Sequence, residues 1–137
     1  MNAETARQIL TTRFKNQWAI LQPTVTVFIE GISEPDLNQQ KAPFVMFRVT
    51  EPGVKQGSLS PVAELKRYKG RVEIVLFNPE GKGTKFFFDA TDTITTILAM
   101  QTVGGVVISN ILVVKRPSAL GWQSRVALVD YSFDSIT

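Results

Sequence analysis

Cysteine and histidine are both absent from this 137-residue chain. Without cysteine there is no disulfide, no thiol nucleophile and no thiolate ligand for a metal. Without histidine the chain lacks the commonest general base at neutral pH and the commonest metal ligand. Long apolar runs are missing too, because the longest one, residues 103–114, contains Ser109 and Asn110 and is too short to span a bilayer. These absences argue against thiol chemistry, histidine-based catalysis and a membrane-spanning helix.

The residues that are present indicate an ordinary globular domain. Hydrophobic residues make up 44% of the chain and charged residues 20%, so a folded core is expected and disorder is not. The length predicts a single domain over residues 1–137. The net charge of +3 is a mild excess, well short of that of a dedicated nucleic-acid binder. Glu4, Arg7 and Arg13 interrupt any apolar segment of a secretory signal peptide, so we expect none.

Residues 65–78 are the stretch around which the chain is organised, and their alternation predicts one long strand. Its even positions form an almost wholly apolar face. Its odd positions begin with Arg67, Lys69 and Arg71 and end apolar, so the second half should be covered on both faces. The basic row has two interpretations: a solvated face, or a surface that meets a partner or a phosphate backbone.

Hydrophobic periodicity places the other elements along the chain. The expected helices span residues 3–21 and 84–101, and the further expected strands span residues 24–29, 43–50, 103–115 and 122–133. Short connections between consecutive strands favour hairpins. The sequence therefore predicts an α+β fold, in which two helices pack on an antiparallel-dominated sheet of about five strands in the order α-β-β-β-α-β-β.

Residues 51–64 have no clear period and are rich in glycine, serine and proline. We expect a loop from Pro52 to Pro61 that is poorly ordered in an isolated subunit or rests on a neighbouring molecule. The alternative is a mobile surface hairpin without such a role. Lys55, Gln56 and Leu59 are the candidate interface residues of this loop.

The helix predicted at residues 84–101 carries a core stripe, with Phe86 and Met100 at its margin. The stripe consists of Phe87, Ala90, Ile94, Ile97 and Leu98. Phe88 lies away from this stripe, and a large exposed aromatic residue is a common interface anchor. The alternative for Phe88 is that a loop of the same subunit, such as residues 31–42, covers it.

Two stretches near this helix are candidates for a chemical site. The glycine turn before it lacks the phosphate-binding pattern, since Leu76 and Gly83 stand where that pattern needs glycine and a hydroxyl residue. Asp89 and Asp92 share an exposed face, but acids near a helix N-terminus usually serve the helix dipole and solubility. We therefore expect no cofactor and no enzymatic activity.

The chain resembles the tail terminator family of long-tailed bacteriophages over nearly its full length. The resemblance lies in the order and spacing of an opening helix that ends near Trp18, then FVMFRVT, then RYKGRVEIVLFNPEGKGT before a second helix, and finally GWQSRVALVDYSF. It implies a structural virion protein without catalytic residues that assembles as a ring of six on the finished tail tube. Such a ring stops tube polymerisation and forms the surface that joins the DNA-filled head.

The resemblance also implies partners and a location. The expected partners are further copies of this chain, the tail tube protein, a head-completion or connector protein and the DNA that passes through the ring, with no membrane. The expected location is the head–tail junction of the virion, and the host cytoplasm during assembly. In this setting Arg67, Lys69 and Arg71 could pair with acids of the next subunit or face the DNA channel.

Three other functions remain open from the sequence. A neck or head–tail adaptor role is the nearest rival within the phage interpretation. A nucleic-acid-binding module would use the three basic residues, but base stacking needs exposed aromatic residues beside them, and Tyr68 points to the other face. A small hydrolase would use Asp89 and Asp92, with turnover lost on an Asp→Asn change.

Overall fold

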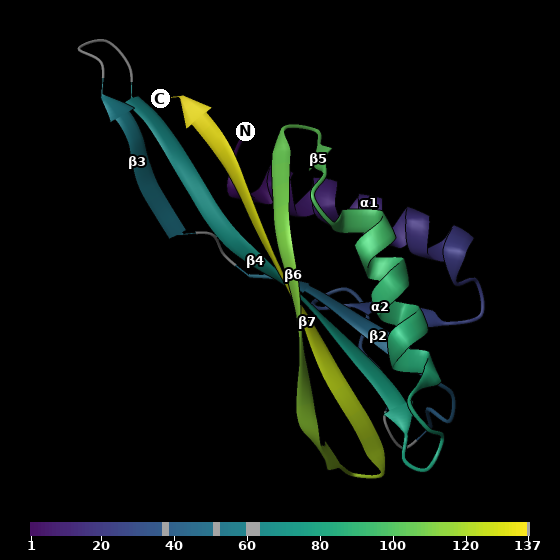
Figure 1. Ribbon diagram of the computed structural model, residues 1–137. Coiled ribbons are helices and arrows are strands. Elements are labelled where there is room, and N and C mark those ends of the chain that lie inside the picture. Colours follow the sequence, from purple (N-terminus) through teal and green to yellow (C-terminus); the bar gives the residue numbers. More distant parts are fainter. Residues whose placement is uncertain (37–38, 51–52, 60–63, 137) are drawn as a thin grey trace.

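A computed structural model describes residues 1–36, 39–50, 53–59 and 64–136 and shows an α+β fold, as predicted (Figure 1). Two helices, α1 (Ala3–Leu21) and α2 (Lys85–Leu98), pack on one face of a seven-stranded sheet. The strands are β1 (Thr26–Ile29), β2 (Phe44–Val49), β3 (Gly53–Leu59), β4 (Glu64–Pro79), β5 (Thr102–Val103), β6 (Val106–Ala119) and β7 (Trp122–Ile136). We call the sheet face that carries the helices the inner face and the opposite one the outer face.

The strands lie in the order β1-β2-β4-β7-β6-β5, and β3 pairs with β4 beside that path. Every pair is antiparallel except β1 with β2, which is parallel. The sheet therefore has seven strands, one pair of them parallel, where about five strands were predicted, so the predicted strand number matches only roughly. The parallel pair arises because the segment between β1 and β2 is long enough to return the chain to the end of the sheet from which β1 starts.

Strand β4 is the centre of the sheet, as its alternating pattern predicted. One edge pairs with β7 from Leu65↔Ile136 to Pro79↔Trp122. The other edge pairs first with β3 and then with β2. The even residues Val72, Ile74 and Leu76 are buried in the core on the inner face.

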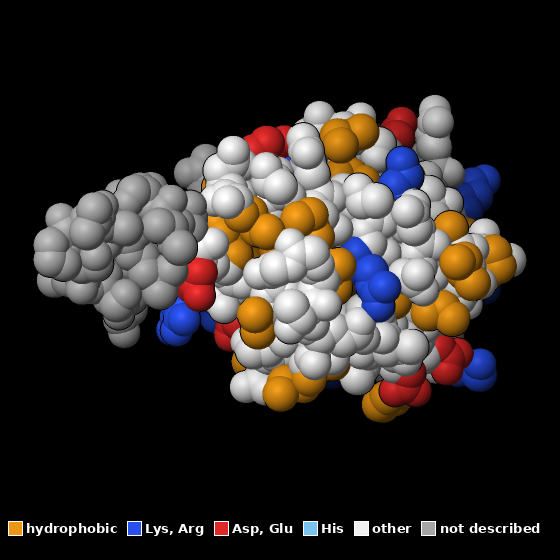
Figure 2. Space-filling view, turned by 90° about the horizontal axis from the view of Figure 1, so that it is seen from above, with side chains coloured by type: hydrophobic (Ala, Val, Ile, Leu, Met, Phe, Trp, Pro, Cys, Tyr) orange, Lys and Arg blue, Asp and Glu red, His pale blue; other side chains and the backbone are white. Residues whose placement is uncertain are grey.

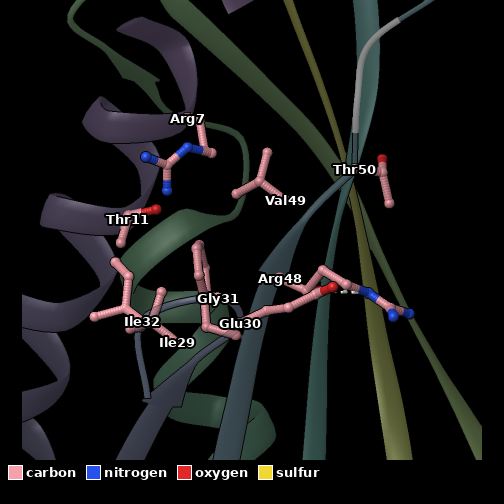
Figure 3. Close-up of a pocket in the computed structure, with 10 residues that line it drawn as sticks. Arg7, Thr11, Ile29, Glu30, Gly31, Ile32, Arg48, Val49 and Thr50 are labelled. Atoms are coloured by element: carbon pink, nitrogen blue, oxygen red, sulfur yellow. Dashed lines mark ion pairs between the residues drawn. The ribbon is translucent and has the colours of Figure 1, made fainter. Parts of the chain in front are cut away.

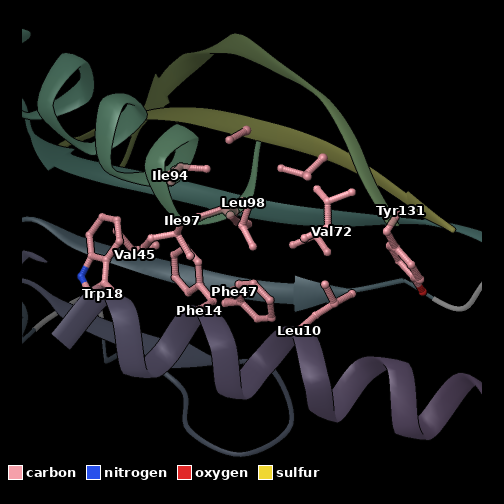
Figure 4. Close-up of a cluster of buried hydrophobic side chains, with 14 of the residues drawn as sticks. Leu10, Phe14, Trp18, Val45, Phe47, Val72, Ile94, Ile97, Leu98 and Tyr131 are labelled. Carbon is pink, nitrogen blue, oxygen red and sulfur yellow. The ribbon is translucent and has the colours of Figure 1, made fainter. Parts of the chain in front are cut away.

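Helix α1 begins and packs as its sequence predicts. The Asn2 side chain caps it by accepting a hydrogen bond from the Thr5 backbone N–H at 2.8 Å. Its buried stripe is Ala6, Leu10, Phe14 and Trp18. Figure 4 shows the stripe's larger side chains lying between the helix and the sheet, where the Phe14 ring stacks on Phe47 at 4.8 Å between centroids. This packing supplies most of the helix's stability, because an isolated helix of this length is marginal in water.

Helix α2 buries the predicted stripe, but it ends earlier than predicted. The five stripe residues are at most 2% exposed. Met100, expected at the margin of the stripe, is 76% exposed and has a φ of 54°. The helix stops at Leu98 because the chain turns there toward β5. The helical period alone did not reveal this turn.

The strand predicted at residues 103–115 is a hairpin of β5 and β6. Gly104 and Gly105 have φ values of 57° and 89° between the paired residues Val103 and Val106. Positive φ at both central residues is the requirement of a two-residue hairpin turn of type I′. The glycine pair therefore reverses the chain where a continuous strand was expected.

Much of the loop predicted from Pro52 to Pro61 is strand β3. It pairs with β4 from Gly53↔Lys69 to Leu59↔Glu64, with a register shift between Gln56 and Ser58. Residues 52, 60 and 61 lie outside the described part of the chain. The sequence did not predict this strand because it has no apolar alternation. The strand forms through its hydrogen-bonded pairing with β4. We call β3, residues 64–69 of β4 and residues 132–136 of β7 the arm, which projects beyond both helices in Figure 1.

Candidate interaction surface

The basic row lies on the outer face of β4, and two of its members are already paired within the chain. Arg67 Nε lies 2.8 Å from Asp134 Oδ1, and Arg71 Nε lies 3.1 Å from Asp130 Oδ1. Both acids stand directly opposite their partners across the β4–β7 ladder. Neither arginine is therefore an unpaired charge within the subunit, and their pairing with acids of a neighbouring subunit stays a prediction. Lys69 faces Ser132 and, within the described part of the chain, forms no ion pair.

Charges of both signs continue across the outer face. Hydrogen bonding from Arg67 lowers the pKa of the Asp134 carboxyl, and the same contact raises the pKa of the Arg67 guanidinium. Arg48 of β2 bonds in the same way to Glu73 of β4, and this contact raises the pKa of Arg48. The face is therefore a ladder of cross-strand ion pairs, and its field toward a phosphate backbone is weaker than three free cations would give.

Phe88 is 61% exposed on α2, so no loop of the described chain covers it. The guanidinium carbon of Arg125 lies 5.6 Å from the Phe88 ring centroid and 4.7 Å from that of Phe87. A cation over an aromatic face is attracted to it, so Phe88 is held in place while most of its surface meets solvent. This arrangement suits an interface anchor, as the sequence suggested.

The structure separates the predicted candidates into two surfaces. Lys55 pairs with Arg67 in the β3–β4 register, so the arm brings two of the candidates together. Gln56 and Leu59 also belong to β3, opposite Lys66 and Glu64. Phe88 lies on a helix that covers the inner face, so it cannot share a contact surface with the basic row on the outer face.

Apolar groups on the outer face were only partly anticipated from the sequence. Phe44 is fully buried there, with ring centroids 4.7 Å from Phe77 and 5.1 Å from Trp122. Beside this aromatic cluster, Leu112 and Val114 of β6 are 60% and 41% exposed. The signal for the cluster was the apolar character of both faces in strands 43–50 and 65–78. Figure 2, which views another side of the molecule, also shows hydrophobic side chains in several separate groups.

Asp89 and Asp92, the carboxylates considered from the sequence, both lie on α2. The Asp89 carboxylate accepts a hydrogen bond from Lys85 Nζ at 2.8 Å, one helical turn away, and this contact raises the pKa of Lys85. Asp92 is exposed on the same helix. No group of three or more acidic residues that could hold a metal ion occurs in the described ranges. No helix among the described residues is long and apolar enough to cross a membrane.

Comparisons with known proteins inform the fold. No protein-family model matches the chain, and no curated protein matches it either. Among the chains of solved structures that match, one whose name states no function is similar over 97% of this chain and 96% of its own, with a TM-score of 0.70 and 11% sequence identity. At that identity the likeness extends to the fold alone, and the α+β domain of this chain is thus similar to a whole solved chain.

Proposed function

We propose that this chain is a structural protein of long-tailed bacteriophages that caps the tail tube, stops its polymerisation and forms the tail-side surface for head joining. A ring of six copies is the proposed assembly, at the head–tail junction of the virion. The whole-chain resemblance in the order and spacing of elements supports this role. The proposal includes no enzymatic activity and no cofactor.

The observation that carries the proposal is a backbone edge of β6, unpaired among the described residues, that another chain could pair with. β6 pairs with β7 along one edge, whereas β5 covers its other edge only at Val106 and Val107. Backbone hydrogen bonds extend this cover, since the Ile108 N–H donates to the Gln101 carbonyl at 2.7 Å and the Met100 N–H donates to the Ser109 carbonyl at 3.4 Å. Beyond Ser109 no described strand pairs with that edge, and Leu112 and Val114 are exposed there. Lys115, Arg116 and Pro117 protect the far end of this edge, but its stretch from Ile111 to Val114 is apolar. Soluble monomers usually protect apolar edges, so this stretch suits a chain that works in an assembly.

A deletion strain tests the role directly. Tails from a phage that lacks the gene are expected to have abnormal lengths or to remain unjoined to heads, as counted by negative-stain electron microscopy. Expression of the intact gene from a plasmid is the control and should restore normal virions. Abnormal lengths would support tube capping itself, whereas tails of normal length that fail to join would support a role at the head–tail junction and favour the neck or adaptor over the cap. Normal tails joined to heads at the normal rate would refute both.

A further inference from the structure

A groove runs along α1 between the helix and the inner face of the sheet. Its larger hollow, about 530 Å³, lies between Arg7 and Thr11 of the helix and residues 29–32 and 47–50 (Figure 3). A second hollow of about 360 Å³ shares Arg7, Val49 and Thr50 with the first and reaches Tyr68 and Tyr131 at the base of the arm. The two hollows together form one elongated groove.

The free edge of a strand borders this groove. β2 pairs with β4 as far as Val49, but it pairs with β1 only as far as Phe47. The Glu30 N–H bonds to the Phe47 carbonyl at 3.1 Å, and the chain then turns away at Gly31, which has a φ of 81°. No described strand therefore pairs with β2 beside Arg48 and Val49. An extended polypeptide is the kind of ligand that completes such an edge.

Two side chains beside the groove differ in their access to a ligand. Thr11 Oγ1 is buried and has no hydrogen-bond partner among the described residues. Figure 3 shows this hydroxyl pointing from α1 toward the space in front of β2. Ile32, on the rim, is 69% exposed although it is a large aliphatic residue. The Thr11 hydroxyl is closed to solvent and therefore to a ligand as well, so the exposed Ile32 side chain is the feature that favours an occupied groove.

The arm of a second copy has the properties that this groove requires. Figure 1 shows β3 at the outside of the arm, clear of both helices, so its second edge is free to pair. The arm is basic, since it carries Lys55, Lys66, Arg67 and Lys69 against Glu64 and Asp134. In the groove itself Arg7 pairs with Glu4 and Arg48 pairs with Glu30, so these lining charges balance. The border of the groove is acidic, because residues 31–36 add Glu34 and Asp36 and no basic residue. Opposite charge on the two surfaces favours their encounter.

We propose that the groove between α1 and β2 receives the arm of a second copy of this chain, with β3 of that copy beside the free edge of β2. This inference rests on the proposed function, because it supplies the subunit contact of the ring. Arm and groove are different surfaces, so the contact is head-to-tail and repeats from copy to copy until a ring closes.

Cross-linking tests the contact, and the absence of native cysteine makes it specific. A Lys55→Cys chain is mixed with an Ile32→Cys chain and treated with a short bis-maleimide. A matched control replaces Ile32→Cys by Ile20→Cys, at a position that is 71% exposed on α1 but does not line the groove. The Ile32 mixture is expected to give about five-fold or more cross-linked dimer than the control, since specific contact raises the local concentration of the thiols. Equal yields would overturn the proposal.

The Ile32→Ser variant gives a second readout that separates binding from folding. Ile32 is 69% exposed in the subunit, so the melting temperature of the monomer should change little. Self-association should weaken on the order of 10-fold, because an apolar contact in the groove is lost. Unchanged association would overturn the assignment of the groove.

The outcomes distinguish this inference from the proposed function. Six-membered rings seen by electron microscopy without the Ile32–Lys55 cross-link would refute the groove contact and leave the role in tail capping intact. The cross-link in a protein whose deletion leaves tails unaffected would support the contact and refute the role. A chain that stays monomeric at every concentration and gives no cross-link would overturn the contact. The role in tail capping would then be tested by the deletion strain alone.

Discussion

Among the described glycines, Gly70 leaves the least room for a side chain. It faces Tyr131 across the β4–β7 ladder, and the Tyr131 ring, which is 2% exposed, covers it. A Cβ atom added to Gly70 would lie 2.5 Å from Cζ and 2.7 Å from Cε1 of that ring. The Tyr131 hydroxyl donates a hydrogen bond to the Thr50 carbonyl at 3.1 Å. Gly70→Ala must therefore displace a buried ring and break this bond.

The expected loss of stability follows from these two effects. Overpacking of a filled core costs about 1–3 kcal/mol, and one lost hydrogen bond adds about 0.5–1.5 kcal/mol. We expect Gly70→Ala to lower the free energy of unfolding by about 2–4 kcal/mol. For a chain of this length that corresponds to a fall in melting temperature on the order of 10 °C.

Urea unfolding followed by tryptophan fluorescence measures this loss, and a second glycine provides the control. Gly53 also lies in a strand, but the nearest atom to an added Cβ is the Lys69 carbonyl oxygen at 4.0 Å. Gly53→Ala should change the stability by less than about 0.5 kcal/mol. In a Tyr131→Leu background the cost of Gly70→Ala should fall below about 1 kcal/mol, because the ring is gone. Equal effects of the two glycine substitutions would refute the reasoning.

Three further predictions concern the surface and the titration of single groups. Phe88→Ala should weaken self-assembly while the melting temperature of the monomer changes by less than about 3 °C, because this ring is exposed; a large loss of monomer stability would place it in the subunit's own core. Arg67→Glu puts like charges opposite each other at Asp134 and should speed amide hydrogen exchange in the arm, whereas adding Asp134→Lys should restore protection; equal exchange in both variants would exclude a role for this pair. Burial raises the pKa of the Tyr131 phenol, so the stabilisation is present below the unfolded pKa of about 10 and is lost as the pH rises through the folded value. Thermal melting between pH 9 and 11 should therefore show a steeper fall for the parent chain than for Tyr131→Phe, and parallel curves would contradict the assignment.

Features that depend on neighbouring residues in the chain could be predicted from the sequence. The cap at Asn2 and the stripe from Ala6 to Trp18 follow from local hydrogen bonding and the helical period, and both are present. The alternation of residues 65–78 likewise predicted a long strand with one apolar face. The position of Phe88 off the core stripe followed from its angle on the helix, whereas its exposure, which the sequence left open, is a finding of the structure. In each case the determining interactions lie within a few turns or a few strand residues, which is the range that periodicity reports.

Features that depend on pairing between distant residues were settled only by the tertiary structure. β3 has no apolar alternation and is a strand because it pairs with β4. Arg67 and Arg71 form ion pairs because the β4–β7 register places acidic residues of β7 opposite them. The groove beside α1 arises because β1 ends two residues before β2 does, a difference that only the parallel pairing makes visible. Periodicity assigns residues to the faces of an element, but register decides which charges meet and which strand edges remain open.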